Sequence, residues 1–243
     1  PQEAPAGFLL TASHSDSPCF RLRDHAELTG EYIRLSAERY GGMINDSWLD
    51  RPLSVAGRVV VRREGGLEAR LVDLKRDVAL IPRVAIHLNR ETNSGVKYDP
   101  ARDLVALYAA GTGSGSFYRE VARTADCAPE DVVAGDLVLY NNQPGTVWGP
   151  EGEFVSAPRL DDLACVFACT EGFLTAQERD MVPVLCVFDN EEIGSETKQG
   201  AASVFLPETL AAISEALGLS AADHRALLAD SMMLSCDNGH ARH

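Results

Sequence analysis

Two adjacent glutamates, Glu191 and Glu192, follow a short apolar run at residues 182–188. An apolar run of this length is typical of a buried strand in a sheet that is covered on both faces. Two neighbouring carboxylates at the end of such a strand repel each other unless a cation or a shared proton holds them. One interpretation is a metal site in which one glutamate binds the ion and its neighbour acts as general base. The alternative is a solvated loop that only carries charge.

Three other segments place potential metal ligands after an apolar strand or at the start of a helix. His14 follows an apolar segment, and Asp16 lies where it could orient the imidazole ring. Asp161 stands at the start of a predicted helix, and Asp237 follows a predicted strand. Each residue alone also fits an ordinary turn or helix cap. Together, one histidine and several carboxylates suit zinc, manganese or cobalt, and their number suffices for two metals that share a bridging carboxylate.

Hydrophobic patterning predicts the elements that would position these residues. Strands are predicted at 7–10, 182–188 and 232–234, and helices from 163 onward, at 208–217 and at 221–229. Open α/β sheets carry their chemistry at the carboxyl ends of the strands. We therefore expect the four ligand-bearing segments to converge at one edge of a single sheet.

The middle of the chain contains predicted β-strands. Residues 57–63 and 67–73 flank a Gly-Gly turn and predict a hairpin, and residues 136–140 predict a short strand. Residues 117–124 are expected to form a helix, and residues 128–131 are typical of a helix start with acidic first-turn residues.

Length and composition indicate an ordinary globular protein and exclude some classes of partner. The 243 residues allow one large domain or two smaller ones. A net charge of −14 opposes binding to the phosphate backbone of nucleic acids. No apolar run reaches the roughly 20 residues that span a bilayer, and no basic region precedes the first apolar patch as in a signal peptide. The six cysteines form no Cys-x-x-Cys pair, so buried free thiols and a cytoplasmic location are expected.

Seven short sequence motifs follow one another along the chain in a characteristic order. They are His-Ser-Asp-Ser-Pro at 14–18, Tyr-Gly-Gly at 40–42, Asp-Arg-Pro-Leu-Ser-Val-Ala-Gly-Arg at 50–58, Ile-Pro-x-x-Ala-Ile-His-Leu-x-Arg at 81–90, Pro-Arg-Leu-Asp-Asp-Leu at 158–163, Phe-Asp-Asn-Glu-Glu-Ile-Gly-Ser at 188–195 and Ser-Cys-Asp at 235–237. In this combination the chain resembles the aspartyl aminopeptidase family of dinuclear metallopeptidases over nearly its whole length.

The resemblance implies an α/β fold, with a central sheet flanked by helices as in zinc aminopeptidases and phosphorylases, and an inserted β-rich dimerisation domain. The catalytic domain would comprise residues 1–19 and 156–243, and the inserted domain residues 20–155. Similar proteins form dimers and larger, often dodecameric, assemblies. The family also has a histidine ligand near its C-terminus, in a Met-His-Ser context that this sequence lacks. We therefore expect the chain to be a fragment without the N-terminal and C-terminal parts of the family.

By motif position, the resemblance implies four metal ligands: His14, Asp161, Glu192 and Asp237. Asp161 would bridge two zinc ions per subunit in the complete protein, with manganese or cobalt as alternatives, and which ion Glu192 binds is left open. Glu191 would be the general base.

Two further roles follow from the resemblance. Asp16 would orient His14. His87 lies in an apolar segment, where a lone histidine is typical of a core or surface residue, but it matches a histidine that enters a neighbouring subunit's active site. There it could stabilise the oxyanion.

The implied activity is removal of N-terminal residues, Asp or Glu by preference, from peptides with a free α-amino group. Two alternatives differ in class. One is a related dinuclear carboxypeptidase or deacylase, which the blocks at 81–90 and 188–195 argue against. The other is a catalytically incomplete fragment or a non-catalytic, oligomerising relative of the same fold.

Overall fold

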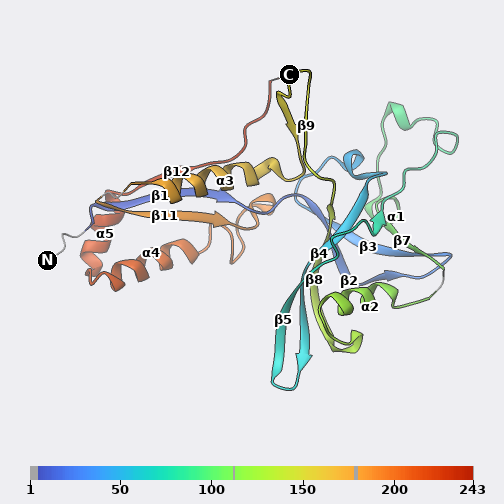
Figure 1. Cartoon of the computed structure of the whole chain (residues 1–243), viewed down its shortest axis with the longest axis horizontal. Coiled ribbons are helices and arrows are strands. Elements are labelled where there is room, and N and C mark those ends of the chain that lie inside the picture. Colours follow the sequence, from blue (N-terminus) through green and yellow to red (C-terminus); the bar gives the residue numbers. More distant parts are fainter. Residues whose placement is uncertain (1–4, 112, 178–179, 243) are drawn as a thin grey trace. The chain divides into compact units, whose positions relative to one another are not determined.

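The computed structural model describes residues 5–111, 113–177 and 180–242. The chain divides into two compact units (Figure 1). Unit 1 comprises Pro1–Ser17 and Arg159–His243, and unit 2 comprises Pro18–Pro158. The divisions therefore fall at 17/18 and 158/159, where the sequence led us to expect 19/20 and 155/156. The catalytic and dimerising roles of the two units stay predictions.

Unit 1 is built on a parallel sheet with the strand order β11-β1-β12. The strands are β1 (Gly7–His14), β11 (Met181–Phe188) and β12 (Met232–Ser235). The β1–β11 register runs from Gly7 opposite Met181 to His14 opposite Phe188, so both strands end side by side. The residues that follow the strands consequently meet at the carboxyl edge of the sheet, as the sequence predicted.

Three helices accompany this sheet: α3 (Leu160–Thr175), α4 (Phe205–Ala216) and α5 (Ala221–Ala229). Helix α3 packs against β1 and β11 (Figure 1). Alternate β1 residues pack with side chains of β11, α4 and α5 in one core, which contains Phe8, Leu10, Ala12, Cys186, Phe188, Leu210 and Leu227. Helix α5 has the predicted bounds because Ser220 and Asp223 form a capping box at its first turn.

Unit 2 is a seven-stranded sheet with the order β5-β4-β6-β7-β3-β2-β8. Its strands are β2 (Cys19–Leu28), β3 (Tyr32–Tyr40), β4 (Pro52–Arg63), β5 (Gly66–Asp73), β6 (Ala79–Leu80), β7 (Ala106–Ala110) and β8 (Val132–Asn141). An additional pairing of β4 with β8 closes every strand except β5 into a barrel-like sheet. Gly57 lies at this crossing, with φ of +145°, and a Cβ there would approach the Asp136 carbonyl oxygen to 2.1 Å. Glycine is therefore required for β4 and β8 to come this close.

The hairpin predicted around the Gly-Gly turn is confirmed, because β4 and β5 pair from Arg63 opposite Gly66 to Ala56 opposite Asp73. The helix start predicted at 128–131 is wrong. Residues Pro129–Asp131 form a single 3-10 turn, η3, that leads directly into β8. Pro129 and the acidic residues resemble a helix start, but the β-rich segment 132–141 follows at once and pairs with β2 and β4.

The remaining elements of unit 2 are short. They are helices α1 (Pro100–Asp103) and α2 (Ser116–Thr124), 3-10 turns η1 (Asn45–Trp48) and η2 (Thr92–Ser94), and the hairpin β9 (Thr146–Trp148) with β10 (Phe154–Ser156). All six cysteines are free thiols, as predicted, but only Cys169 and Cys186 are buried. None of the helices in the described part of the chain has the length and apolar character needed to cross a membrane.

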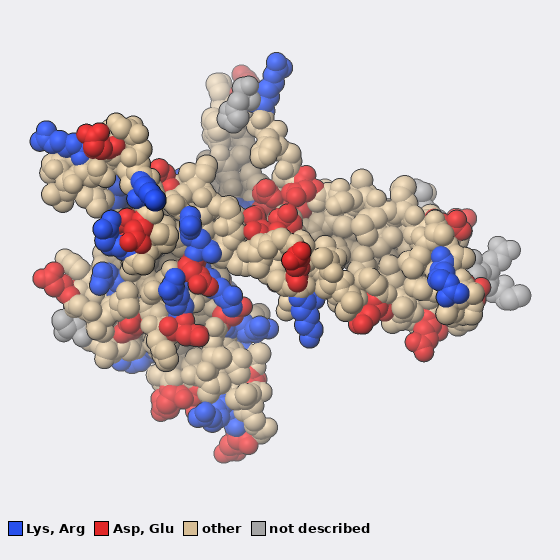
Figure 2. All heavy atoms as spheres, turned by 180° about the vertical axis from the view of Figure 1, so that it is seen from behind, with Lys and Arg blue, Asp and Glu red and all other residues tan. Residues whose placement is uncertain are grey.

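The negative charge of the protein is concentrated in unit 1. This unit contains 16 Asp and Glu residues against 5 Lys and Arg residues, a net charge of −11 out of −14 for the chain. Few Lys and Arg side chains lie over unit 1 on the face that Figure 2 shows. Such an imbalance favours the binding of cations to this unit.

Candidate metal centre

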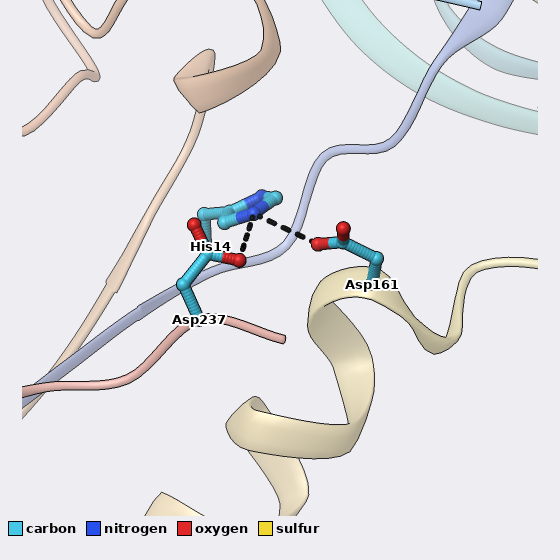
Figure 3. Close-up of side chains that lie close together, drawn as sticks. All are labelled: His14, Asp161 and Asp237. Atoms are coloured by element: carbon cyan, nitrogen blue, oxygen red, sulfur yellow. Dashed lines mark ion pairs between the residues drawn. The ribbon is translucent and has the colours of Figure 1, made fainter. Parts of the chain in front are cut away.

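Three potential ligands meet at the carboxyl edge of the unit 1 sheet (Figure 3). His14 is the last residue of β1, Asp161 lies at the start of α3, and Asp237 follows β12. One ligand atom from each lies within 4.8 Å of the others. The Nε2 atom of His14 is 3.4 Å from Asp161 Oδ1 and 3.8 Å from Asp237 Oδ1.

The imidazole of His14 is held by Asp16 at Nδ1, and its Nε2 faces the other carboxylates of the site. Its side chain is only 5% exposed, and Nδ1 lies 3.2 Å from the carboxylate and 3.0 Å from the backbone oxygen of Asp16. With the proton on Nδ1, the lone pair of Nε2 points to the carboxylates of the site. Within the described part of the chain, Nε2 is buried without a hydrogen-bond partner. A metal ion would satisfy this nitrogen.

The electrostatics of His14 also favour a cation. Burial lowers the tendency of the ring to be charged, but the surrounding carboxylates outweigh it and raise its pKa; they belong to Asp16, Asp162, Glu191 and Asp237. The site thus provides negative potential at the position of Nε2.

Asp16 connects His14 to the two glutamates. Besides its contact with the ring, its carboxylate accepts hydrogen bonds from the backbone N–H groups of Glu191, at 3.1 Å, and Glu192, at 3.2 Å. The side chain of Asp16 is 7% exposed. It therefore fixes the end of β1 against the 3-10 turn η4 (Glu191–Ile193), which follows β11.

The two glutamates differ in their position relative to the histidine. The Oε2 atom of Glu191 lies 3.8 Å from His14 Nε2, and its side chain is half exposed. Glu192 is more buried, and burial, together with the charges of Glu191 and Asp161, raises its pKa. In the described residues, the group of close ligand atoms contains neither glutamate.

Crowding of carboxylates also affects Asp161. Burial, followed by the negative charge of Asp237, raises the pKa of Asp161. Because neighbouring carboxylates repel one another, a cation at this position would stabilise their charged forms.

Asp162 also belongs to this site, although no role is predicted for it from the sequence. It is fully buried, and its Oδ2 accepts a hydrogen bond from the backbone N–H of His14 at 3.1 Å. Its Oδ1 lies 3.4 Å from Nδ2 of Asn238. A hydrogen bond to Asp162, with burial, raises the pKa of the Cys165 thiol to about 12. The peptide bond between Asp161 and Asp162 is cis.

His87 lies in unit 2, between β6 and η2, and its side chain is exposed. Of the two ordinary interpretations of a lone histidine, core or surface, the structure therefore gives the surface one, and the role of His87 in a neighbouring subunit stays a prediction. Its neighbours Val84, Ile86 and Leu88 are also exposed.

A histidine and carboxylates gathered at the carboxyl edge of a parallel α/β sheet define the class of site found in metal-dependent hydrolases. The family follows from comparison with known sequences. Residues 2–243 match the family of aminopeptidase I zinc metalloproteases (M18), and the chain belongs to this family.

Curated relatives match nearly the whole length of this chain. A probable M18 family aminopeptidase 2 from Clostridium acetobutylicum is 40% identical over 250 residues, covering 99% of this chain and 57% of the relative. One from Mycobacterium leprae is 37% identical over 245 residues, with the same coverage of 99% and 57%. The chain therefore spans a little more than half the length of these relatives.

Solved structures agree with the fold. A chain of the Ape4 and Nbr1 complex has a TM-score of 0.92 at 31% identity, covering 99% of this chain and 51% of that one. The mApe1 dodecamer of S. cerevisiae has a TM-score of 0.82 at 29% identity, covering 98% of this chain and 56% of that one. The fold of this chain is accordingly that of M18 aminopeptidases.

Proposed function

We propose that this protein is a zinc-dependent aminopeptidase that removes N-terminal residues, with a preference for Asp and Glu, through a dinuclear site in unit 1. The observation that carries the proposal is the buried Nε2 of His14, which faces the carboxylates of Asp161 and Asp237 and has no hydrogen-bond partner among the described residues. Membership of a zinc metalloprotease family supports zinc as the ion, and manganese and cobalt suit the same donors.

The donor set fits a divalent ion. His14, Asp161 and Asp237 would hold it, and Glu192 would supply a further ligand on the same side of the sheet. Zinc accepts imidazole nitrogen and carboxylate oxygen together, and a carboxylate has two oxygens, so Asp161 could serve two ions. When bound, zinc would act as a Lewis acid that polarises the scissile carbonyl and lowers the pKa of water.

Glu191 is the general base in this proposal. Its carboxylate lies beside the ligand group without being part of it, and its backbone is held by Asp16. A half-exposed carboxylate at this position accepts the proton of the attacking water and later passes a proton to the leaving amine.

The preference for a free N-terminus follows from charge. Five carboxylates surround one imidazole at this edge of the sheet, those of Asp16, Asp161, Glu191, Glu192 and Asp237, and unit 1 as a whole is strongly negative. These carboxylates would offset the charge of two bound zinc ions, and those that do not bind metal would pair with a protonated α-amino group. The acidic preference at the N-terminal residue rests on the family resemblance.

Self-association is also part of the proposal. The mApe1 structure to which the chain is similar is a dodecamer. We place His87 at such an interface, where its exposed imidazole would reach the site of a neighbouring subunit and stabilise the oxyanion. The exposed apolar side chains of Val84, Ile86 and Leu88 would be buried by the same contact.

Hydrolysis of amino-acid p-nitroanilides tests the activity. The zinc-loaded protein is expected to cleave aspartyl-p-nitroanilide faster than leucyl-p-nitroanilide, to lose this activity with a chelator and to regain it with zinc. Cleavage that survives complete removal of metal would contradict the mechanism. Faster cleavage of the leucyl substrate would contradict only the acidic preference.

A further inference from the structure

We infer that Asp162 is a positioning residue whose buried carboxylate, together with Asn238, holds the three metal-ligand segments of unit 1 in one arrangement. This inference rests on the proposed metal site. It assigns to Asp162 a function in zinc affinity rather than in capping α3.

The hydrogen bonds of Asp162 reach beyond its own helix. The carboxylate accepts from the backbone N–H of His14, at the end of β1, and lies within 3.4 Å of the Asn238 amide, which follows β12. Arg159, the residue before α3, makes no side-chain capping hydrogen bond, and the backbone of Asp161 and Asp162 is not helical. Besides its hydrogen bond with Cys165 in α3, Asp162 therefore bonds to the end of β1 and to the segment after β12, and capping of α3 requires neither of these two contacts.

Each contact is made next to a metal ligand. Asp162 adjoins Asp161 in sequence, Asn238 adjoins Asp237, and the bond to His14 is made by the backbone of the ligand residue itself. Asn238 also donates from Nδ2 to the backbone oxygen of Leu160, at 2.6 Å. Two side chains thus connect the end of β1, the start of α3 and the segment after β12.

The burial of the Asp162 carboxylate has a desolvation cost that other interactions must offset. Asp162 has no exposed surface, and it lies among other carboxylates in the more negative unit. A buried carboxylate is tolerated when hydrogen bonds and nearby positive charge compensate its desolvation. A zinc ion at the adjoining ligands would provide that charge, while the hydrogen bonds keep the ligands fixed.

The substitution Asp162→Asn tests the inference because it preserves the shape of the side chain. Asparagine has one acceptor oxygen, which can serve His14, but its NH₂ group would then face the NH₂ group of Asn238. The amide of Asn238 cannot rotate to present its oxygen instead, because it would lose the hydrogen bond from Nδ2 to the Leu160 backbone oxygen. We expect zinc affinity, measured by competition with a chromophoric chelator, to fall about 10- to 100-fold.

Three further variants make the test specific. Asn238→Ala should also weaken zinc binding. The double variant should bind zinc no more weakly than Asp162→Asn alone, because both changes remove the same contact between Asp162 and Asn238. Asp180→Asn makes the same chemical change at an exposed aspartate at the other end of β11 and should leave the affinity unchanged. The visible spectrum of the cobalt-substituted protein should change in Asp162→Asn and not in Asp180→Asn, which loss of stability alone would not produce.

The outcomes separate this inference from the proposed function. A wild-type chain that binds zinc, with an Asp162→Asn variant of equal affinity, would overturn the positioning role alone. Independent, multiplying effects of the two single substitutions would overturn it as well. If Asp162→Asn does not fold, unchanged affinity in Asn238→Ala overturns the inference by itself. A wild-type chain without affinity for zinc would overturn both the metal site and the role of Asp162.

Discussion

Replacing Glu191 by glutamine is expected to lower kcat about 10²- to 10⁴-fold while zinc content stays unchanged. Glutamine has the size of glutamate and keeps the backbone N–H that bonds to Asp16, so the turn η4 should be preserved. It cannot accept the proton of the attacking water. Since Glu191 is not among the four ligands proposed for the centre, the metal should remain bound.

The matched control is Glu196→Gln, an exposed glutamate five residues further along the same loop, which should keep full activity. Steady-state kinetics and elemental analysis of the same samples provide both readouts. Loss of zinc together with activity would show that Glu191 is a ligand, and retention of activity would exclude it as the base.

Replacing Asp161 by asparagine is expected to reduce zinc affinity more than any other single ligand substitution in the site. A bridging carboxylate binds both ions. Its removal should therefore lower zinc affinity by more than the roughly 100-fold that is the upper limit for removing a hydrogen-bonded partner of a metal ligand. Activity should fall with it. Zinc titration and thermal melting, each with and without the metal, measure the effect.

Metal-free stability distinguishes a ligand from a structural carboxylate. Burial and the charge of Asp237 raise the pKa of Asp161 in the folded protein. A raised carboxyl pKa means that the folded state binds the proton more tightly than the unfolded state, so the ionised group opposes folding at neutral pH. Metal-free Asp161→Asn should therefore melt at pH 7 no lower than metal-free wild type, but should lose the stabilisation that zinc gives. A lower melting temperature without zinc would indicate that Asp161 stabilises the fold by itself.

The elements that carry the site could be predicted because their signals are local. The apolar run at 182–188 and the residues after it became β11 and η4, and the capping box at Ser220 fixed the start of α5. Because parallel strands end at one edge of a sheet, His14 and Asp237 could be predicted to lie close together from their positions after two predicted strands, and they do.

What could not be predicted depends on non-local contacts or on neighbours that look alike. Asp161 and Asp162 have the same side chain and adjacent positions, yet one faces the ligand group and the other is buried against His14. Hydrophobic patterning does not separate them, and only the family resemblance pointed to Asp161 as the ligand. The closure of the unit 2 sheet through β4 and β8 joins segments about 80 residues apart, and its register depends on the close approach at Gly57. The residues after Asp131 likewise became a strand because β2 and β4 offered partners.

The most direct test of the metal centre is the number of zinc ions bound per chain, determined by elemental analysis after equilibration with zinc and removal of unbound metal. Two zinc ions per chain are predicted, from the ligands His14, Asp161, Glu192 and Asp237. About one ion would keep the centre but contradict its dinuclear form. A protein that retains no zinc would contradict the claim that the carboxyl edge of the unit 1 sheet is a metal site.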